Sequence, residues 1–261
     1  MIANYHSHTV RCRHATGTQR EYVENAIRAG FRVFGFSDHT PYPFDGGYVS
    51  PIRMQPEELE NYVRETLDLK KEYRDDILIR LGLEAEYYPR YFDALLRLCE
   101  PYPIEYLILG QHATDNEMDG VFTGHPTDDE EVLQKYCSQA AEGLETGRFL
   151  CLAHPDLVNY TGDPAIYDHY MRGLCRKLKA LGIPAEINFL GLKEHRNYPD
   201  PRFWKIAGEE EIDVVFGVDA HHTENVFLPD CEQAAGNLVR QYGLHLLNDL
   251  EGRLVPGADR Q

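Results

Sequence analysis

Two histidines near the N-terminus are separated by a single residue, in the segment Tyr5-His6-Ser7-His8-Thr9. The apolar residues before them predict a short strand, in which residues i and i+2 point to the same side. The two imidazoles would therefore be directed at one point, and imidazole is a common ligand for zinc, iron and copper. Such a pair is more often incidental than functional, so a metal site needs support from the rest of the chain.

Acidic, amide and imidazole side chains recur at one kind of position, directly after apolar segments that predict strands. The predicted strands cover residues 1–5, 33–37, 77–83, 106–110, 149–153, 185–188 and 214–218. The polar side chains at their ends are His6 and His8, Asp38 and His39, Glu84 and Glu86, His112, His154, Asn188, and Asp219 and His221. Structural histidines in a core would not explain so regular a placement, and the pattern therefore favours a metal cluster.

Segments with helical periodicity alternate with these strands, at residues 19–29, 56–73, 91–99, 128–146, 164–181, 201–211 and 230–242. Gly30 and Gly182 would end two of these helices, and Thr127 with Glu130 fits a capping box before another. Strand–helix alternation implies a parallel sheet, and about seven such units favour a closed barrel. An open doubly wound sheet would need a glycine-rich phosphate loop after the first strand, which this sequence lacks.

Length and charge restrict the class of protein. The 261 residues suit one α/β barrel domain over 1–261, with a polar, frayed tail from about residue 251. The net charge of −17 argues against general affinity for nucleic acid or anionic membranes. Six scattered cysteines, no membrane-length apolar run and no leader before the first motif predict a reduced, cytoplasmic protein. The oligomeric state stays open.

These motifs, in this order, resemble the PHP family, the polymerase and histidinol phosphatase superfamily. The matching pieces are His6-Ser7-His8, His14, Ser37-Asp38-His39, Gly82-Leu83-Glu84, Gly110-Gln111-His112, Ala153-His154-Pro155-Asp156 and Gly217-Val218-Asp219-Ala220-His221. The resemblance spans almost the whole chain and implies a distorted (β/α)7 TIM-like barrel in a single domain. It also implies two or three divalent metal ions, and mixed imidazole and carboxylate sites accept zinc, manganese or iron. One metal would be held by His6, His8, Glu84 and Asp219, a second by Glu84, His112 and His154, and a third by His14, His39 and His221.

Within that family the chain is most similar to the histidinol-phosphate phosphatase branch. The similarity lies in the spacing of Cys12 and His14, in Arg53-Met54, and in Glu186-Ile187-Asn188 followed by Gly191-Leu192. Lys193 stands where this family usually has an arginine that would hold phosphate. A lysine can act there as a point charge but cannot form a bidentate fork, so this departure concerns the substrate more than the metals.

The resemblance implies hydrolysis of a small phosphate monoester, with L-histidinol phosphate of histidine biosynthesis as the leading candidate. Bound metals would generate a hydroxide that attacks phosphorus in line. Asp38 and His39 are candidate catalytic residues, because Asp38 could orient the ring of ligand His39 or transfer protons. Either Asp156 or an ordered water would protonate the leaving alkoxide.

Four further residues are candidates for binding the substrate. Arg53, Lys193 and Arg196 could hold its phosphate, although ordinary surface cations are an equally good explanation. Glu86 could meet a cationic group of the substrate or be a solvated loop residue.

Two other functions remain compatible with the sequence. Another phosphoesterase of the same family could act on nucleotides or other small phosphate esters, although a nuclease should carry a basic groove and this chain has no Lys/Arg cluster. A non-catalytic metal-binding or regulatory barrel is the second alternative, and the complete set of ligand residues argues against it.

Overall fold

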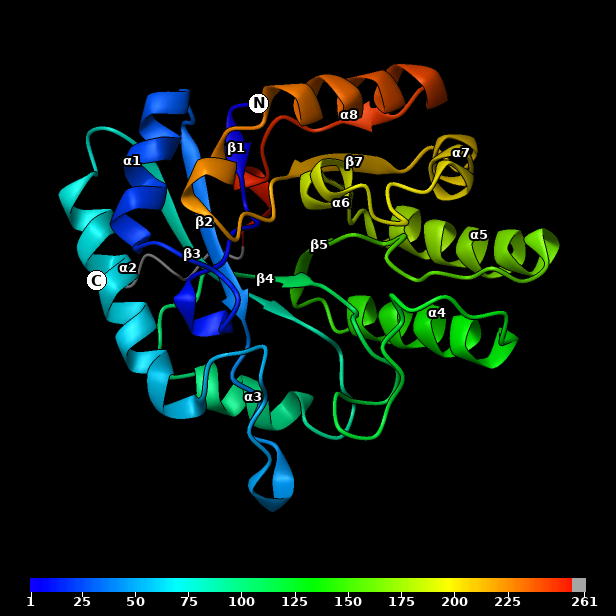
Figure 1. Cartoon of the computed structure of the whole chain (residues 1–261), viewed down its shortest axis with the longest axis horizontal. Coiled ribbons are helices and arrows are strands. Elements are labelled where there is room, and N and C mark those ends of the chain that lie inside the picture. The colour runs from blue at the N-terminus through cyan, green and yellow to red at the C-terminus, as the bar shows by residue number, and fades with distance from the viewer. Residues whose placement is uncertain (255–261) are drawn as a thin grey trace.

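The chain folds into one curved sheet of eight parallel strands, as a computed structural model shows for residues 1–254 (Figure 1). The strands pair in chain order and are β1 (Ala3–Asn4), β2 (Val33–His39), β3 (Leu78–Ala85), β4 (Tyr106–Leu109), β5 (Phe149–Leu152), β6 (Ala185–Asn188), β7 (Asp213–Gly217) and β8 (His245–Leu246). Because each strand but the last is followed by helix, the predicted α/β barrel-like fold is confirmed, in the form of a curled sheet.

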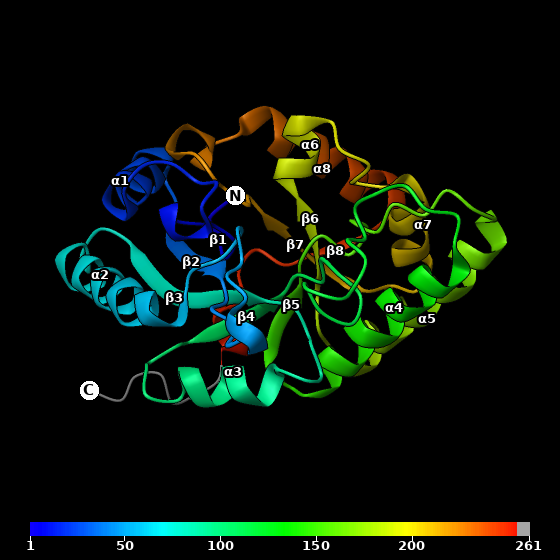
Figure 2. The ribbon, with the colours of Figure 1, turned by 60° about the horizontal axis from the view of Figure 1, so that its bottom comes forward.

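The helices lie around the outside of the curved sheet (Figure 2). They are α1 (Gln19–Ala29), α2 (Leu59–Glu72), α3 (Phe92–Cys99), α4 (Glu130–Glu145), α5 (Pro164–Leu181), α6 (Phe189–Glu194), α7 (Pro201–Glu209) and α8 (Pro229–Tyr242). Gly30 and Gly182 end α1 and α5 in the left-handed conformation, with φ of +83° and +66°, as predicted. No helix within residues 1–254 is both long and apolar enough to cross a membrane.

Two helix starts differ from the prediction. The predicted capping box of Thr127 and Glu130 does not form, because Asp129 caps α4 by accepting from the N–H of Glu131. Helix α6 was not predicted at all, since six residues directly after a strand give too little periodicity to detect. It begins where the side-chain oxygen of Asn188 accepts from the N–H of Gly191 at 3.2 Å.

The segment after β1 meets the segment after β7 at the carboxyl ends of the strands. The N–H of His8 donates to the carbonyl of Ala220 at 3.0 Å, and the N–H of Asp219 donates to the carbonyl of His6 at 2.9 Å. At the opposite end of β7, Asp213 instead pairs with His245 of the short strand β8, which was not predicted. The sheet is therefore closed on the side that carries the polar residues, and the N-terminal and C-terminal motifs become neighbours.

The opposite side of the sheet is held by a polar network that includes the C-terminal segment. Glu251, in a single 3-10 turn at Glu251–Arg253, accepts from the hydroxyl of Tyr5 at 2.9 Å and from Nε of Arg80 at 3.1 Å. The frayed tail predicted from about residue 251 therefore does not begin there. The remainder of that prediction, residues 255–261, lies outside the described residues.

Tyr106 fills the interior of the curved sheet. Its hydroxyl donates to the carbonyls of Tyr5 at 2.8 Å and Phe36 at 3.0 Å. Its ring occupies the space where a Cβ on Gly82 would lie. A side chain at residue 82 would therefore displace the ring from these hydrogen bonds.

Gly82→Ala is expected to lower the free energy of unfolding by about 1–3 kcal/mol, because the added methyl overpacks the interior. Gly173→Ala is the matched control: a Cβ there, within α5, meets no atom within 4 Å, and removing a helical glycine raises stability by about 0.5–1 kcal/mol. Urea unfolding followed by circular dichroism measures both. Equal stability of the two variants would contradict the placement of Tyr106.

Candidate metal centre

Nine residues expected from the sequence to bind metal lie together at the carboxyl ends of the strands. They are His6, His8, His14, His39, Glu84, His112, His154, Asp219 and His221, and most of them are buried. Their donor atoms fall into three overlapping groups. Assignment of these groups to bound ions remains a prediction.

The first group joins the segments that follow β1, β3 and β7. Oδ1 of Asp219 lies 3.4 Å from Nε2 of His6 and 3.0 Å from Nε2 of His8. The carboxylate of Glu84, from β3, lies opposite, with Oε1 3.6 Å from His6 Nε2 and Oε2 3.5 Å from His8 Nε2. Two imidazoles and two carboxylates thus surround one point, a donor set that suits zinc, manganese or iron.

The second group shares Glu84 with the first. Oε1 of Glu84 lies 2.9 Å from Nε2 of His154 and 3.6 Å from Nε2 of His112. Glu84 can therefore bridge two adjacent positions with its two oxygens. Gly110 makes this possible, because a Cβ on that residue would overlap the Glu84 carboxylate.

The third group consists of His14, His39 and His221, whose donor nitrogens all lie within 4.8 Å of one another. The rings of His14 and His221 are stacked, with centroids 4.6 Å apart. Nδ1 of His39 also lies 3.0 Å from Oε2 of Glu84, so this group adjoins the other two.

Several buried donor atoms in these groups have no hydrogen-bond partner within the described residues. They are Nε2 of His6, both ring nitrogens of His8, Nδ1 of His39, Oε2 of Glu84, Nδ1 of His154, Oδ1 of Asp219 and Nε2 of His221. Buried polar atoms are almost always paired in native proteins. The unpaired Nε2 atoms of His6 and His8, with Oε2 of Glu84 and Oδ1 of Asp219, lie around one point and fit a divalent ion.

The charges of the groups also suit cations. Burial by itself raises the pKa of Glu84, but the imidazoles of His39 and His6 outweigh it and hold the pKa well below the usual value. The pKa of Asp219 is likewise held low against its burial by His6 and His8. Burial lowers the pKa of His8, yet the nearby carboxylates of Asp219 and Asp38 raise it to about 9. Both carboxylates are ionised, and bound cations would displace protons from the imidazoles.

Carboxylates behind the imidazoles fix their orientation. Oε1 of Glu186 lies 2.8 Å from Nδ1 of His6, and the other oxygen accepts from the N–H of His154 at 3.0 Å. A proton on Nδ1 leaves Nε2 of His6 free as the ligand atom. Glu186 was not predicted as a site residue, although it belongs to a motif noted in the sequence. Its position before Asn188 in a buried strand was the available signal.

Arg53 and Glu86 were predicted to bind substrate, and the structure gives them a different role. Glu86 is fully buried and lies 3.0 Å from Nδ1 of His112, so it orients that imidazole. Arg53 is 1% exposed and donates to both oxygens of Glu86, at 2.9 and 3.1 Å, and to Glu117 at 2.7 Å. A guanidinium fully engaged with two carboxylates is not available to a phosphate.

Asp38 and Asp156 were also predicted to have catalytic roles. Asp38 is buried and lies 3.5 Å from Nδ1 of His8, while it meets His39 only through that residue's backbone N–H, at 2.9 Å. It therefore supports His8 and not the ring of His39. Asp156 accepts from Trp204 Nε1 at 2.8 Å and does not line the cavity over the centre. Burial raises the pKa of Asp156 to about 7, and its role as the proton donor stays a prediction.

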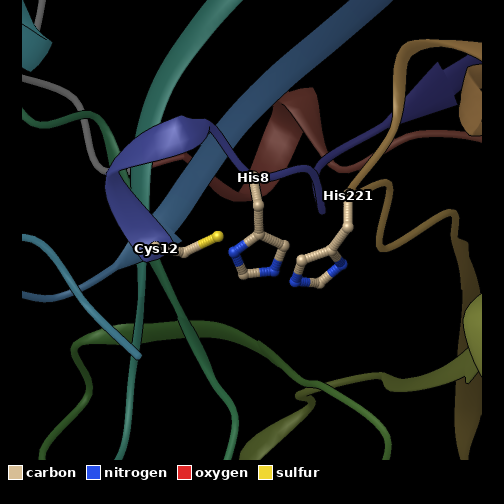
Figure 3. Close-up of side chains that lie close together, drawn as sticks. All are labelled: His8, Cys12 and His221. Carbon is tan, nitrogen blue, oxygen red and sulfur yellow. The ribbon is translucent and has the colours of Figure 1, made fainter. Parts of the chain in front are cut away.

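Cys12 is a neighbour of the centre that was not predicted as a site residue. Figure 3 shows its thiol directed at the ring of His8, with His221 on the other side of that ring. The sulfur and the nearest nitrogens of the two histidines lie within 4.8 Å of one another. Burial raises the pKa of the thiol, which keeps it neutral. Its backbone carbonyl lies 2.6 Å from Nδ1 of His14, which leaves Nε2 of His14 as the ligand atom.

A cavity of about 250 Å³ opens above the three groups. Its apolar walls are formed by Ile52, Phe122, Leu157, Leu190 and Tyr198. Arg196, a predicted phosphate-binding residue, lines the cavity, whereas Lys193 does not. The fold and the donor set together define the class of the protein: an α/β barrel with a candidate centre of imidazole and carboxylate ligands at the carboxyl ends of its strands.

The chain belongs to the PHP domain family, whose model matches residues 4–189. It is 29% identical over 236 residues to a probable histidinol-phosphatase of Deinococcus radiodurans, covering 86% of this chain and 88% of that protein. It is 36% identical over 101 residues to the histidinol-phosphatase of Bacillus subtilis, covering 37% and 38% of the two chains. The fold is similar to the crystal structure of histidinol phosphate phosphatase from Lactococcus lactis with zinc, L-histidinol and phosphate, with a TM-score of 0.73, 21% identity and coverage of 97% and 98%.

Glu84→Gln is expected to reduce bound metal by more than one equivalent, because this carboxylate is shared by the first two groups. The zinc-induced rise in melting temperature, which follows from binding to the folded state, should shrink accordingly. Elemental analysis and thermal unfolding with and without zinc measure both effects. His169→Asn, at an exposed position on α5, is the control, and equal metal content in the two variants would contradict a shared Glu84.

Glu86→Gln is expected to weaken metal binding at the position of His112 by about 10- to 100-fold, because it removes the carboxylate that orients that ring. Glu117→Gln, which removes the other carboxylate paired with Arg53 but touches no imidazole, should change this affinity little. Competition with a chromophoric chelator gives both affinities. An equal loss in the two variants would assign Glu86 a purely structural role.

Proposed function

We propose that this chain is a metal-dependent phosphomonoesterase that hydrolyses L-histidinol phosphate to L-histidinol and phosphate. The observation that carries the proposal is the Glu84 carboxylate, shared by two groups of imidazoles at the floor of one cavity. Relatives named histidinol-phosphatases, one of them aligned over 86% of this chain, support the substrate. The Lactococcus lactis structure, which holds zinc, L-histidinol and phosphate in the same fold, supports it further.

Some residues of the chain would bind or orient the metal ligands, and others would bind the substrate. When bound, divalent ions supply Lewis acidity and a nucleophilic hydroxide near neutral pH. Glu186, Glu86 and Asp38 hold the imidazoles in position from behind. The apolar walls of the cavity exclude water and contact the carbon part of the substrate, and the Arg196 guanidinium offsets phosphate charge.

Zinc is the ion we propose, because the Lactococcus lactis enzyme was crystallised with it. Manganese and iron suit the same donors, and two or three ions would occupy the three groups. We further propose that residues 1–261 form a single PHP domain in the cytoplasm, where the six unpaired cysteines would stay reduced.

The zinc-loaded protein is expected to release phosphate from L-histidinol phosphate faster than from nucleotides or an aryl phosphate, because one arginine and apolar walls suit a small ester. A phosphate-release assay over this panel, repeated after chelation and after zinc is restored, measures the order. Activity should disappear with the chelator and return with zinc. Preference for nucleotides would favour the alternative phosphoesterase, and absence of turnover on every ester would favour a non-catalytic barrel.

A further inference from the structure

The cavity has two charged residues that the metal centre does not use. Among the described residues that line it, the carboxylates are Glu84, Asp219 and Glu194, and Arg196 is the one lysine or arginine. Glu84 and Asp219 belong to the metal groups. Glu194 and Arg196 flank His195, which ends α6 in a left-handed conformation with φ of +54°. This turn presents both charges to the same cavity.

Glu194 and Arg196 bind each other, but one carboxylate oxygen of Glu194 stays available to a ligand. Oε2 of Glu194 accepts from Nε of Arg196 at 2.9 Å and forms an ion pair with Nη2 of the same guanidinium, 2.7 Å away. Nη1 of Arg196 donates to the hydroxyl of Tyr198 at 3.0 Å. Within residues 1–254, Oε1 of Glu194 accepts no hydrogen bond from another side chain or backbone N–H. Both side chains are accessible, with exposed fractions of 42% for Glu194 and 43% for Arg196.

Lys193 does not take part in this arrangement. It is exposed, lies near Cys231 of α8 and is absent from the cavity wall. The lysine at the position expected to bind phosphate therefore lies outside the cavity wall, and the charges in that wall beyond the metal groups come from Glu194 and Arg196.

We propose that Glu194 binds a primary ammonium group of the substrate and so makes the cavity selective for phosphate esters of amino alcohols. The inference rests on the proposed function. In L-histidinol phosphate the amine-bearing carbon is joined to the ester oxygen through one methylene, so the ammonium stays close to the phosphate. With the phosphate at the metal centre, the ammonium lies within the cavity, and Oε1 of Glu194 accepts a charge-assisted hydrogen bond from it. Arg196 fixes the carboxylate and faces the phosphate.

The test compares L-histidinol phosphate with its analogue that lacks the amine, 3-(imidazol-4-yl)propyl phosphate, on the zinc-loaded protein. Glu194→Gln should lower the wild-type preference for the amine-bearing ester, as a ratio of kcat/KM values, by about 10- to 100-fold, which is the worth of a hydrogen bond to a charged group. The loss should fall mainly on KM. Glu131→Gln, an exposed glutamate paired with a lysine on α4, is the matched control and should keep the wild-type ratio.

An unchanged ratio in Glu194→Gln, or an equal loss on both esters, would overturn the ammonium site while leaving the phosphatase intact. A wild-type protein that hydrolyses neither ester would overturn the proposed function and this inference together. The two failures are distinguishable, because the first leaves turnover of L-histidinol phosphate in the wild-type protein.

Discussion

A single buried carboxylate, that of Glu84, is the interaction on which the rest of the structure depends. An ionised carboxylate in a protein interior is costly unless opposite charges or hydrogen bonds surround it. Five imidazoles from four separate segments approach its two oxygens, namely those of His6, His8, His39, His112 and His154. Parallel strands that end on one face are the means by which distant segments reach one point. Bound cations would, together with the imidazoles, offset the negative charge of this buried carboxylate.

The backbone around this carboxylate is shaped by the same requirement. Asp219 and His154 have positive φ values, +52° and +28°, which residues other than glycine rarely adopt. Such conformations persist only where the surroundings enforce them, and here the N–H of Asp219 donates to the carbonyl of His6 while that of His154 donates to Glu186. Strained backbone at two predicted ligands is thus stabilised by the strand closure and by an orienting carboxylate.

Carboxylates that lie behind the imidazoles explain why several residues have roles other than those predicted from the sequence. Asp38 and Glu86 each lie behind an imidazole, as Glu186 does, and Arg53 neutralises Glu86 from the side away from the metal groups. The cavity itself is mostly apolar, with its charges confined to the metal floor and to the pair Glu194 and Arg196.

The sequence by itself determined the fold class and the set of candidate ligands, because strand periodicity and residues such as His6, Glu84 and Asp219 are local features that need no knowledge of neighbours. The sequence does not show which distant elements a side chain will contact in the folded protein. Arg53 and Arg196 look equally suited to phosphate in the sequence, yet one is enclosed by Glu86 and Glu117 and the other faces the cavity. Only the tertiary structure decided between them, since the partners that enclose Arg53 lie more than thirty residues away in the chain.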